Sequence, residues 1–295
     1  GSYALPVGTR FTNNGTFGVL GGAVVTVPGE TTNAVGGVLI GGTWNIEGGS
    51  RLTLAGNGQI FASTANIALR GVGSRFDNIR NTLSTNLGTL TLDRLGAFPF
   101  VTAGVFTNTG SLTFVHGPEA TSTTLPASLM ISSSGDINID GYGALVVVGS
   151  LVMTAGSLDG SGALVIDGRF EFLGGALGGD GLTIISGTGA MTINAPGAGF
   201  RPFDRDLLNQ GLLDWKTGDL AGAATLDNLG TFLLSSAAGA AMWSRSGSNT
   251  ARVENRGLML RAGVSGVTQT LAIPVDVEDG SVVVASGSLA FTEGG

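Results

Sequence analysis

The fold is decided by a stretch in the middle of the chain that reads Asp140-Gly-Tyr-Gly-Ala-Leu-Val-Val-Val-Gly149. It is repeated 19 residues later as Asp159-Gly-Ser-Gly-Ala-Leu-Val-Ile-Asp-Gly168, and after 19 more as Gly178-Gly-Asp-Gly-Leu-Thr-Ile-Ile-Ser-Gly187. A fixed period near 20 residues is typical of a solenoid, in which each repeat forms one turn that packs on the next. We therefore expect two columns of stacked residues, the glycines 141, 160 and 179 and the core residues Val147, Ile166 and Ile185.

A second motif, apolar-x-Asn-x-Gly-x-apolar, carries the repeat through much of the chain. The asparagine tolerates left-handed backbone at a corner, and its side-chain amide can bond to the same amide one turn above. The distance between successive motif glycines varies from 19 to 27 residues, which indicates that loops are inserted at corners without breaking the stack. The clearest copies begin at Phe11, Phe106, Leu226 and Val253, with weaker ones at Asn86 and Asn209.

The composition agrees with a coiled β-chain. Glycine accounts for 52 of 295 residues without the Gly-X-Y period of collagen, and proline for only 8. The longest apolar runs, such as Ala144–Val148, are far shorter than the roughly 20 residues of a membrane-spanning helix. The sequence thus predicts an all-β fold, a right-handed parallel β-helix (β-solenoid) with 19–27 residues per turn and, at about 21 residues per turn, roughly 14 turns.

Charge and cysteine content exclude several classes of partner and site. The net charge is −7 and Lys216 is the single lysine, so the chain has no basic patch and we expect no nucleic-acid partner. There is no cysteine, so disulfides do not stabilise the fold, and a single histidine does not make a zinc site.

The domain organisation expected from these patterns is simple. Residues 1–10 form a lead-in that begins with Gly1-Ser2, which looks like a cloning remnant, and residues 11–295 form a single continuous β-solenoid. Loop excursions are expected near 74–84, 115–128, 195–206 and 237–250. We expect the chain to be a segment of a longer protein, whose neighbouring domains cover the terminal turns. An uncovered strand edge offers unpaired backbone groups, so end-to-end self-association is an alternative.

Segments such as Gly156-Ser-Leu-Asp-Gly-Ser-Gly-Ala-Leu-Val-Ile166 and Val253-Glu-Asn-Arg-Gly-Leu-Met-Leu260 resemble the degenerate β-strand repeats of large bacterial surface proteins. These include autotransporter passengers and filamentous-haemagglutinin-like adhesins, and the resemblance covers most of residues 11–291. It implies export to the bacterial cell surface or the extracellular space, with surface polysaccharide or a host-cell receptor as partner. The Asn-Pro-Asn-Gly secretion motif and a translocator barrel are absent from the sequence, which leaves the export route open.

Two groups of residues are candidates for catalysis. Asp204, Arg205 and Asp206 form the densest polar cluster, and paired carboxylates could hydrolyse a glycan or support a lyase reaction. The alternative is a solvated loop with an Asp–Arg pair. His116 lacks an accompanying nucleophile motif, and we expect it in an exposed loop rather than in a catalytic triad.

Two further groups are candidates for binding. Asp140 and Asp159 are equivalent in successive repeats, and calcium between the turns would offset their mutual repulsion; the alternative is that they splay outward into water. Trp215 and Trp243 could stack on sugars, as could Trp44, but the three are out of register, which favours packing roles.

The sequence therefore favours a structural stalk or adhesin segment of a large exported bacterial surface protein. It favours no enzymatic activity and no cofactor, with calcium at Asp140 and Asp159 as the exception to test. The alternative function is a carbohydrate-active β-helix that binds an extracellular polysaccharide or cleaves it as a hydrolase or lyase.

Overall fold

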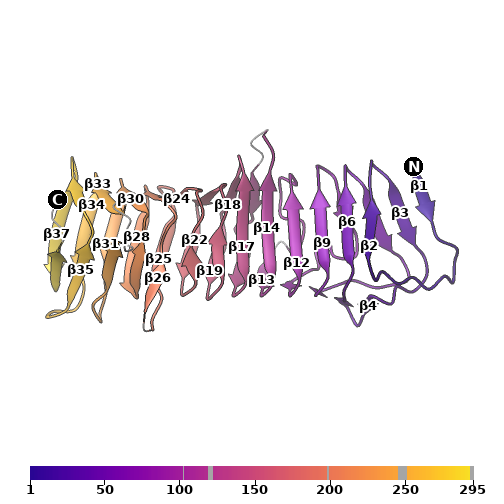
Figure 1. The fold of residues 1–295 in the computed structure, drawn as a ribbon, viewed down its shortest axis with the longest axis horizontal. Helices are drawn as coiled ribbons and strands as arrows, with labels where there is room; N and C mark the ends of the chain where they lie inside the picture. Colours follow the sequence, from indigo (N-terminus) through magenta and orange to yellow (C-terminus); the bar gives the residue numbers. More distant parts are fainter. Residues whose placement is uncertain (102, 119–121, 198, 245–250, 293–295) are drawn as a thin grey trace. The chain divides into compact units, whose positions relative to one another are not determined.

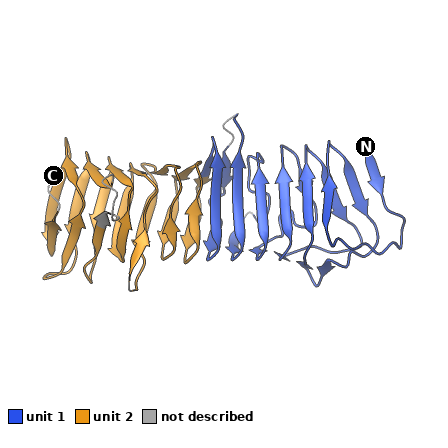
Figure 2. Ribbon diagram, in the orientation of Figure 1, with its two compact units in different colours: residues 1–145 blue, residues 146–295 orange. Residues whose placement is uncertain are grey.

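The computed structural model describes residues 1–101, 103–118, 122–197, 199–244 and 251–292, the side chains of Trp243 and Ser244 excepted. These residues form β-strands and no helix, and parallel stacked sheets make a β-solenoid of about 13 turns, one fewer than the spacing predicts. No helix in the described part is therefore long and apolar enough to cross a lipid bilayer. The chain divides into two compact units, unit 1 (residues 1–145) and unit 2 (residues 146–295), coloured in Figure 2.

Unit 1 is a stack of short parallel strands, in which successive turns lie side by side (Figure 1). Its strands belong to faces that we name by a central strand. The β7 face contains β1 (Ser2–Ala4), β3 (Val24–Val27), β7 (Arg51–Leu54) and β10 (Arg75–Phe76). The β9 face contains β2 (Thr16–Val19), β6 (Thr43–Glu47), β9 (Asn66–Arg70), β12 (Thr89–Asp93), β14 (Ser111–His116) and β17 (Asp136–Gly141). The β13 face contains β4 (Ala34–Val35), β5 (Val38–Leu39), β8 (Ala62–Ser63), β11 (Thr85–Asn86), β13 (Gly104–Asn108) and β16 (Leu129–Ser133). β15 (Thr123–Leu125) belongs to none of these three faces. The hairpin of β4 and β5 is antiparallel, unlike the parallel pairs that build these faces in the described part of unit 1.

Unit 2 repeats the same construction. The β22 face contains β19 (Ser150–Met153), β22 (Arg169–Phe172), β25 (Ala190–Asn194), β28 (Leu212–Thr217), β31 (Thr231–Leu234), β34 (Leu258–Ala262) and β37 (Ser281–Ser286). The β24 face contains β18 (Ala144–Val147, which begins at the end of unit 1), β21 (Ala163–Ile166), β24 (Thr183–Ile185), β27 (Leu207–Asn209), β30 (Thr225–Asn228), β33 (Arg252–Asn255) and β36 (Val275–Val277). The β29 face contains β26 (Phe200–Pro202), β29 (Asp219–Gly222), β32 (Ala241–Ser244), β35 (Thr268–Ala272) and β38 (Ser288–Phe291), and a further pair consists of β20 (Ser157–Asp159) and β23 (Ala176–Leu177).

Alternation of side chains along each strand builds the core. In β6 and β7 every second residue is buried, because successive side chains of a strand point to opposite faces. The parallel register then stacks buried apolar side chains of successive turns on one another. Leu151, Phe170 and Met191 form one such fully buried column. Each buried side chain of this size contributes roughly 1.5–3 kcal/mol.

The repeat register predicted for the core residues is confirmed in unit 2. Ile166 pairs with Ile185, the amide of Asp167 donates to the carbonyl oxygen of Val147 at 3.0 Å, and all three apolar side chains are buried. Gly179 stacks on Gly160, where an added Cβ would overlap the backbone of Gly160, and the positive φ of +80° at Gly179 itself favours glycine. Gly141 belongs to unit 1, so its stacking on Gly160 stays a prediction.

The Asn-x-Gly motif builds a ladder of buried amides in each unit. In unit 2 the Nδ2 of Asn209 donates to the Oδ1 of Asn228 at 2.7 Å, and the Nδ2 of Asn228 donates to the Oδ1 of Asn255 at 2.6 Å. In unit 1 Asn86 donates in the same way to Asn108 at 2.8 Å, and Asn108 donates to the Oγ of Ser133 at 3.0 Å. Amide bonding between turns is thus confirmed. The expectation of left-handed backbone was wrong for these residues, because they lie within strands and only Asn81 and Arg94 have a positive φ among the described non-glycine residues.

The predicted excursions have varied structures. Residues 77–82 form turns after β10, whereas 123–125 and 200–202 form the short strands β15 and β26. Residues 119–121, 198 and 245–250 of the predicted excursions lie outside the described residues.

Candidate functional site

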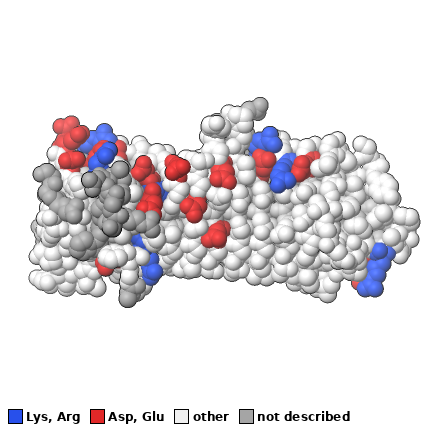
Figure 3. Space-filling model, in the orientation of Figure 1, with Lys and Arg blue, Asp and Glu red and all other residues white. Residues whose placement is uncertain are grey.

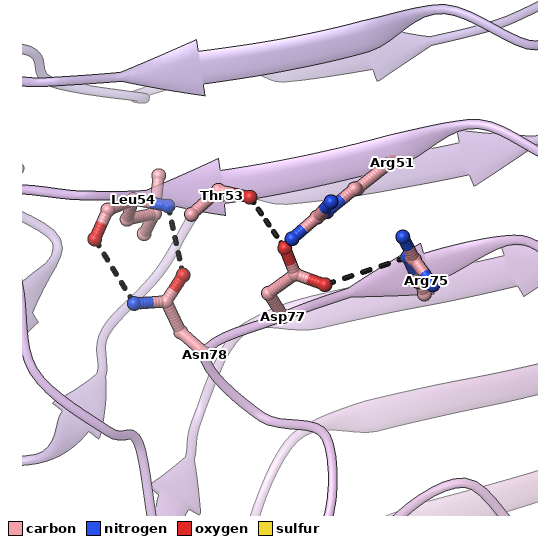
Figure 4. A network of polar contacts seen from close by, with 6 residues as sticks. All are labelled: Arg51, Thr53, Leu54, Arg75, Asp77 and Asn78. Carbon is pink, nitrogen blue, oxygen red and sulfur yellow. Dashed lines mark hydrogen bonds and ion pairs between the residues drawn. The ribbon is translucent and has the colours of Figure 1, made fainter.

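An ion-pair network lies on the β7 face of unit 1 (Figure 4). The carboxylate of Asp77 accepts a hydrogen bond from the Nε of Arg51, and its Oδ1 lies 3.6 Å from the Nε of Arg75. The hydroxyl of Thr53 donates to the same carboxylate at 2.5 Å. Arg51 and Arg75 occupy paired positions on neighbouring strands, so the parallel register itself brings two guanidinium groups to one carboxylate.

The next residue, Asn78, fixes the corner that carries Asp77. Its Oδ1 accepts the amide of Leu54 at 2.8 Å, and its Nδ2 donates to the carbonyl oxygen of Leu54 at 3.0 Å (Figure 4). The Nδ2 also donates to the carbonyl oxygens of Asn57 and Gly58 at 3.2 and 3.0 Å. Asn78 is buried, and buried polar groups need hydrogen-bond partners. Its side chain therefore satisfies backbone groups of the preceding turn that would otherwise lack one.

A cavity of about 270 Å³ opens beside this network, between two consecutive corners of unit 1. It is lined by residues 73–76, 79–81, 95 and 97–100, together with Leu69. The two corners are joined by a hydrogen bond of 3.2 Å from the amide of Asn81 to the carbonyl oxygen of Pro99. Asn81 has a φ of +61°, a left-handed conformation that asparagine adopts more readily than most residues.

The cavity lining combines apolar walls with positive charge. Phe76, Phe98 and Phe100 are buried around it, and Phe98 packs edge-on against Phe100 with ring centroids 5.2 Å apart. The two ionisable side chains in the lining are Arg75 and Arg80. Arg80 is exposed and forms no ion pair within the described part of the chain, and the terminal nitrogens of Arg75 form no hydrogen bond there. Such a lining can hold an organic anion.

The structure separates the predicted catalytic cluster. The Oδ1 of Asp204 accepts the amide of Ala223 at 3.0 Å, and the Oδ1 of Asp206 accepts the amide of Thr225 at 2.7 Å, each 19 residues along the chain. Both carboxylates therefore hold the corner of the following turn.

Arg205 points in the opposite direction, into unit 2, where it is only 1% exposed. Its guanidinium donates to the carbonyl oxygens of Gly160, Gly162 and Gly178 and to the hydroxyl of Thr183. Burial lowers the pKa of Arg205 to about 10, against the opposing effect of Asp159, so the side chain stays protonated at neutral pH. The expectation of a solvated loop was thus wrong for Arg205.

Arg261 is a second buried arginine that the sequence analysis does not identify. It donates to the carbonyl oxygens of Leu234, Ser236, Val267 and Ser288, and burial lowers its pKa. Its position in β34 provides a signal, because it follows the buried Met259 by two residues and aligns with the core residue Leu234 of β31.

The calcium candidates Asp140 and Asp159 belong to different units, and each carboxylate lies against groups of its own unit. The Oδ2 of Asp140 accepts a hydrogen bond from Asn138 at 2.8 Å, and the carboxylate of Asp159 lies against Gly178. Within the described residues no group of three or more His, Cys, Asp or Glu side chains could hold a metal ion.

Two of the tryptophans are core residues. Trp215 is fully buried, stacks on Phe232 at a centroid distance of 6.5 Å and donates through its Nε1 to the carbonyl oxygen of Gly218. Trp44 is equally buried, among Phe11, Phe17 and Phe76. The structure thus leaves neither ring a face for a sugar. The side chain of Trp243 lies outside the described residues.

His116 is the last residue of β14 and is only 3% exposed, so its placement in an exposed loop was wrong. Its Nε2 lies 3.3 Å from the hydroxyl of Thr123. Burial lowers the pKa of His116, and the backbone near Asp140 and the charge of Asp93 oppose that shift. We therefore expect a neutral imidazole at pH 7.

Surface charge is sparse. On the face shown in Figure 3 most of the surface is uncharged, and several positive and negative side chains adjoin. The ion pairs include Arg70 with Glu47 at 2.6 Å in unit 1 and Arg169 with Glu171 at 2.8 Å in unit 2. Exposed pairs of this kind contribute about 0–1 kcal/mol each.

Comparisons with protein-family models, with curated proteins and with solved structures find no match to this chain.

Proposed function

We propose that the chain is a structural segment of a large exported bacterial surface protein, in which it supplies length and stiffness and displays its surface without catalysing a reaction. The observation that carries this proposal is the set of buried side-chain bonds between turns. The amide ladders connect three successive turns in each unit, and Arg205 and Arg261 each hold carbonyl groups from several turns.

These bonds suit a mechanical role for a physical reason. In a solenoid each turn contacts only the turns next to it. The force that the stack withstands therefore depends on the junctions between adjacent turns. Surface ion pairs would reinforce such a junction weakly, whereas buried hydrogen bonds are costly to break because the separated groups stay unsatisfied until water reaches them. Export and adhesion rest on the resemblance of the repeats to bacterial surface proteins.

Pulling on single molecules of the full chain, held at both termini, tests the proposal. We expect unfolding in discrete force peaks, and a lower peak force for Asn228→Ala because that change removes the central rung of the unit 2 ladder. Asn14→Ala is the matched control, since Asn14 is exposed. Gradual extension without force peaks, or equal forces for both variants, would contradict the mechanical role.

A further inference from the structure

We propose that the cavity between the corners 73–81 and 95–100 of unit 1 binds a carboxylate carried on a six-membered ring, such as a hexuronate. This goes beyond the structural role, because a spacer needs no cavity with a charged lining.

The first argument is charge. Both ionisable groups of the lining are guanidiniums, in a protein whose net charge is −7. The nearby carboxylate of Asp77 is engaged with Arg51, Thr53 and Arg75 on the β7 face and is not part of the lining. The Nε of Arg75 forms an ion pair with Asp77 at 3.6 Å, and the two terminal nitrogens face no such partner within the described residues, which leaves them for a ligand oxygen. A guanidinium is suited to a planar carboxylate because its rigid fork of donors matches the two oxygens.

The second argument is shape and hydration. A volume of about 270 Å³ is slightly smaller than the roughly 300–1,000 Å³ of typical ligand pockets, which suits one ring rather than an oligomer. The walls formed by Leu95, Ala97, Phe98 and Pro99 offer apolar contact to a ring face, and the guanidiniums of Arg75 and Arg80 offer charge to its substituent. A small inorganic anion would leave the apolar walls uncovered, and a neutral sugar would leave the guanidiniums without a counter-charge.

The third argument is positioning. The corner carrying Arg75 and Arg80 is fixed by Asn78 on one side and by the bond from Asn81 to Pro99 on the other. The two arginines are therefore presented from a held backbone, so a ligand does not have to order the loop when it binds.

The test is a titration of the ¹⁵N-labelled full chain with glucuronate, followed by amide NMR shifts. We expect saturable shifts confined to residues 73–81 and 95–100, with affinity that falls as salt is added. Arg80→Gln should weaken binding about tenfold, the loss expected for one charge-assisted hydrogen bond. Arg10→Gln is the matched control, because Arg10 is also exposed, lies in the same unit and forms no ion pair within the described residues.

Other arms of the titration separate the sources of the signal. Ala97→Leu fills the cavity without changing charge and should abolish the shifts. Benzoate in place of glucuronate tests whether the ring is a sugar or an aromatic acid, and binding of either acid supports the assignment. Glucose, the neutral counterpart, should not bind. Absence of shifts with both acids, equal binding of glucose, or equal losses for Arg80→Gln and Arg10→Gln would overturn the proposal.

Discussion

Asn228 shows how one residue type serves two turns at once. It accepts the amide of Asn209, donates to Asn255, and donates a second hydrogen bond of 3.2 Å to the carbonyl oxygen of Leu258. Asn209 repeats the second bond to Thr231 at 2.9 Å. These two acceptors lie three residues beyond the asparagine of the following turn, so each of these two asparagines donates one rung and one corner bond.

We expect Asn228→Ala to lower the free energy of unfolding by about 3 kcal/mol, because the change leaves buried partners unsatisfied on both neighbouring turns. Urea unfolding measures the loss, and Asn14→Ala should be close to neutral. A loss as small as that of the control would show that the rung adds nothing to stability.

His116 should make stability depend on pH. Its pKa is lowered in the folded chain by burial, so between that value and the ordinary 6.5 the unfolded chain binds the proton first. Stability is therefore fully present above about pH 6.5 and falls as the pH drops toward the folded pKa. We expect His116→Gln to remove this component, seen as a smaller difference in unfolding free energy between pH 7.5 and 5.5. An unchanged difference would contradict the prediction, because it would mean that folding does not lower the pKa of His116.

Turns are held in register by the glycine that follows each ladder asparagine. A Cβ at Gly230 would overlap the carbonyl oxygen of Gly211, and one at Gly257 would overlap that of Gly230. The strands between these corners tolerate very different loop lengths, since Asp227 pairs with Glu254 across 27 residues and Val165 with Ile184 across 19. The fixed element of the repeat is thus the corner and not the period.

The corner and the strand alternation could be predicted from sequence because both leave a local pattern. Asn-x-Gly indicates a corner, and alternating apolar residues indicate a strand with one buried face, at each place in the chain where they occur. The role of Arg205 could not be predicted, because the same Asp-Arg-Asp string fits a solvated loop until the carbonyls of Gly160 and Gly178 are known to converge on it. The cavity at Arg75 and Arg80 was missed for a similar reason, since its walls come from two corners that carry no repeat.

We expect Arg205→Met to lower the free energy of unfolding by about 3 kcal/mol or more, because three carbonyl groups lose a charged donor in a buried site. Arg169→Met is the control in the same unit; it removes a half-exposed ion pair and should cost less than about 1 kcal/mol. Denaturant unfolding of the two variants gives the comparison. Equal losses would show that the buried guanidinium contributes no more than a surface pair.

At the scale of the whole molecule, each unit is a one-dimensional stack in which stability is a sum over neighbouring turns. The carboxylates first considered for catalysis serve this stacking, since Asp204 and Asp206 each accept a backbone amide of the next turn, and Asp219 does the same. Their placement supports a structural role for these carboxylates. The candidate binding site is formed by other residues, in unit 1.

We expect the full chain to release no product from plant, algal or bacterial polysaccharides. Reducing ends and the absorbance of unsaturated products measure hydrolase and lyase activity respectively. Turnover that is abolished by Asp204→Asn or Asp206→Asn in a protein with an unchanged circular dichroism spectrum would instead establish the carbohydrate-active alternative.

The amide ladders also give each stack a direction. Every Nδ2 donates toward the carboxy-terminal side, and the backbone carbonyls that share those donors fix the orientation, so the amide dipoles add instead of cancelling. A turn joined after a ladder meets a donor, whereas a turn joined before it meets an acceptor, the Oδ1 of Asn209, which lacks a partner within the described residues. In unit 1 the hydroxyl of Ser133 takes the place of an amide, because it accepts a hydrogen bond from Asn108 and donates one of 2.8 Å to the carbonyl oxygen of Gly135. The two ends of a ladder are therefore not equivalent when turns are added by duplication. A turn inserted into a ladder must carry, at the ladder position, a side chain that accepts a hydrogen bond from the preceding turn and donates one to the following turn.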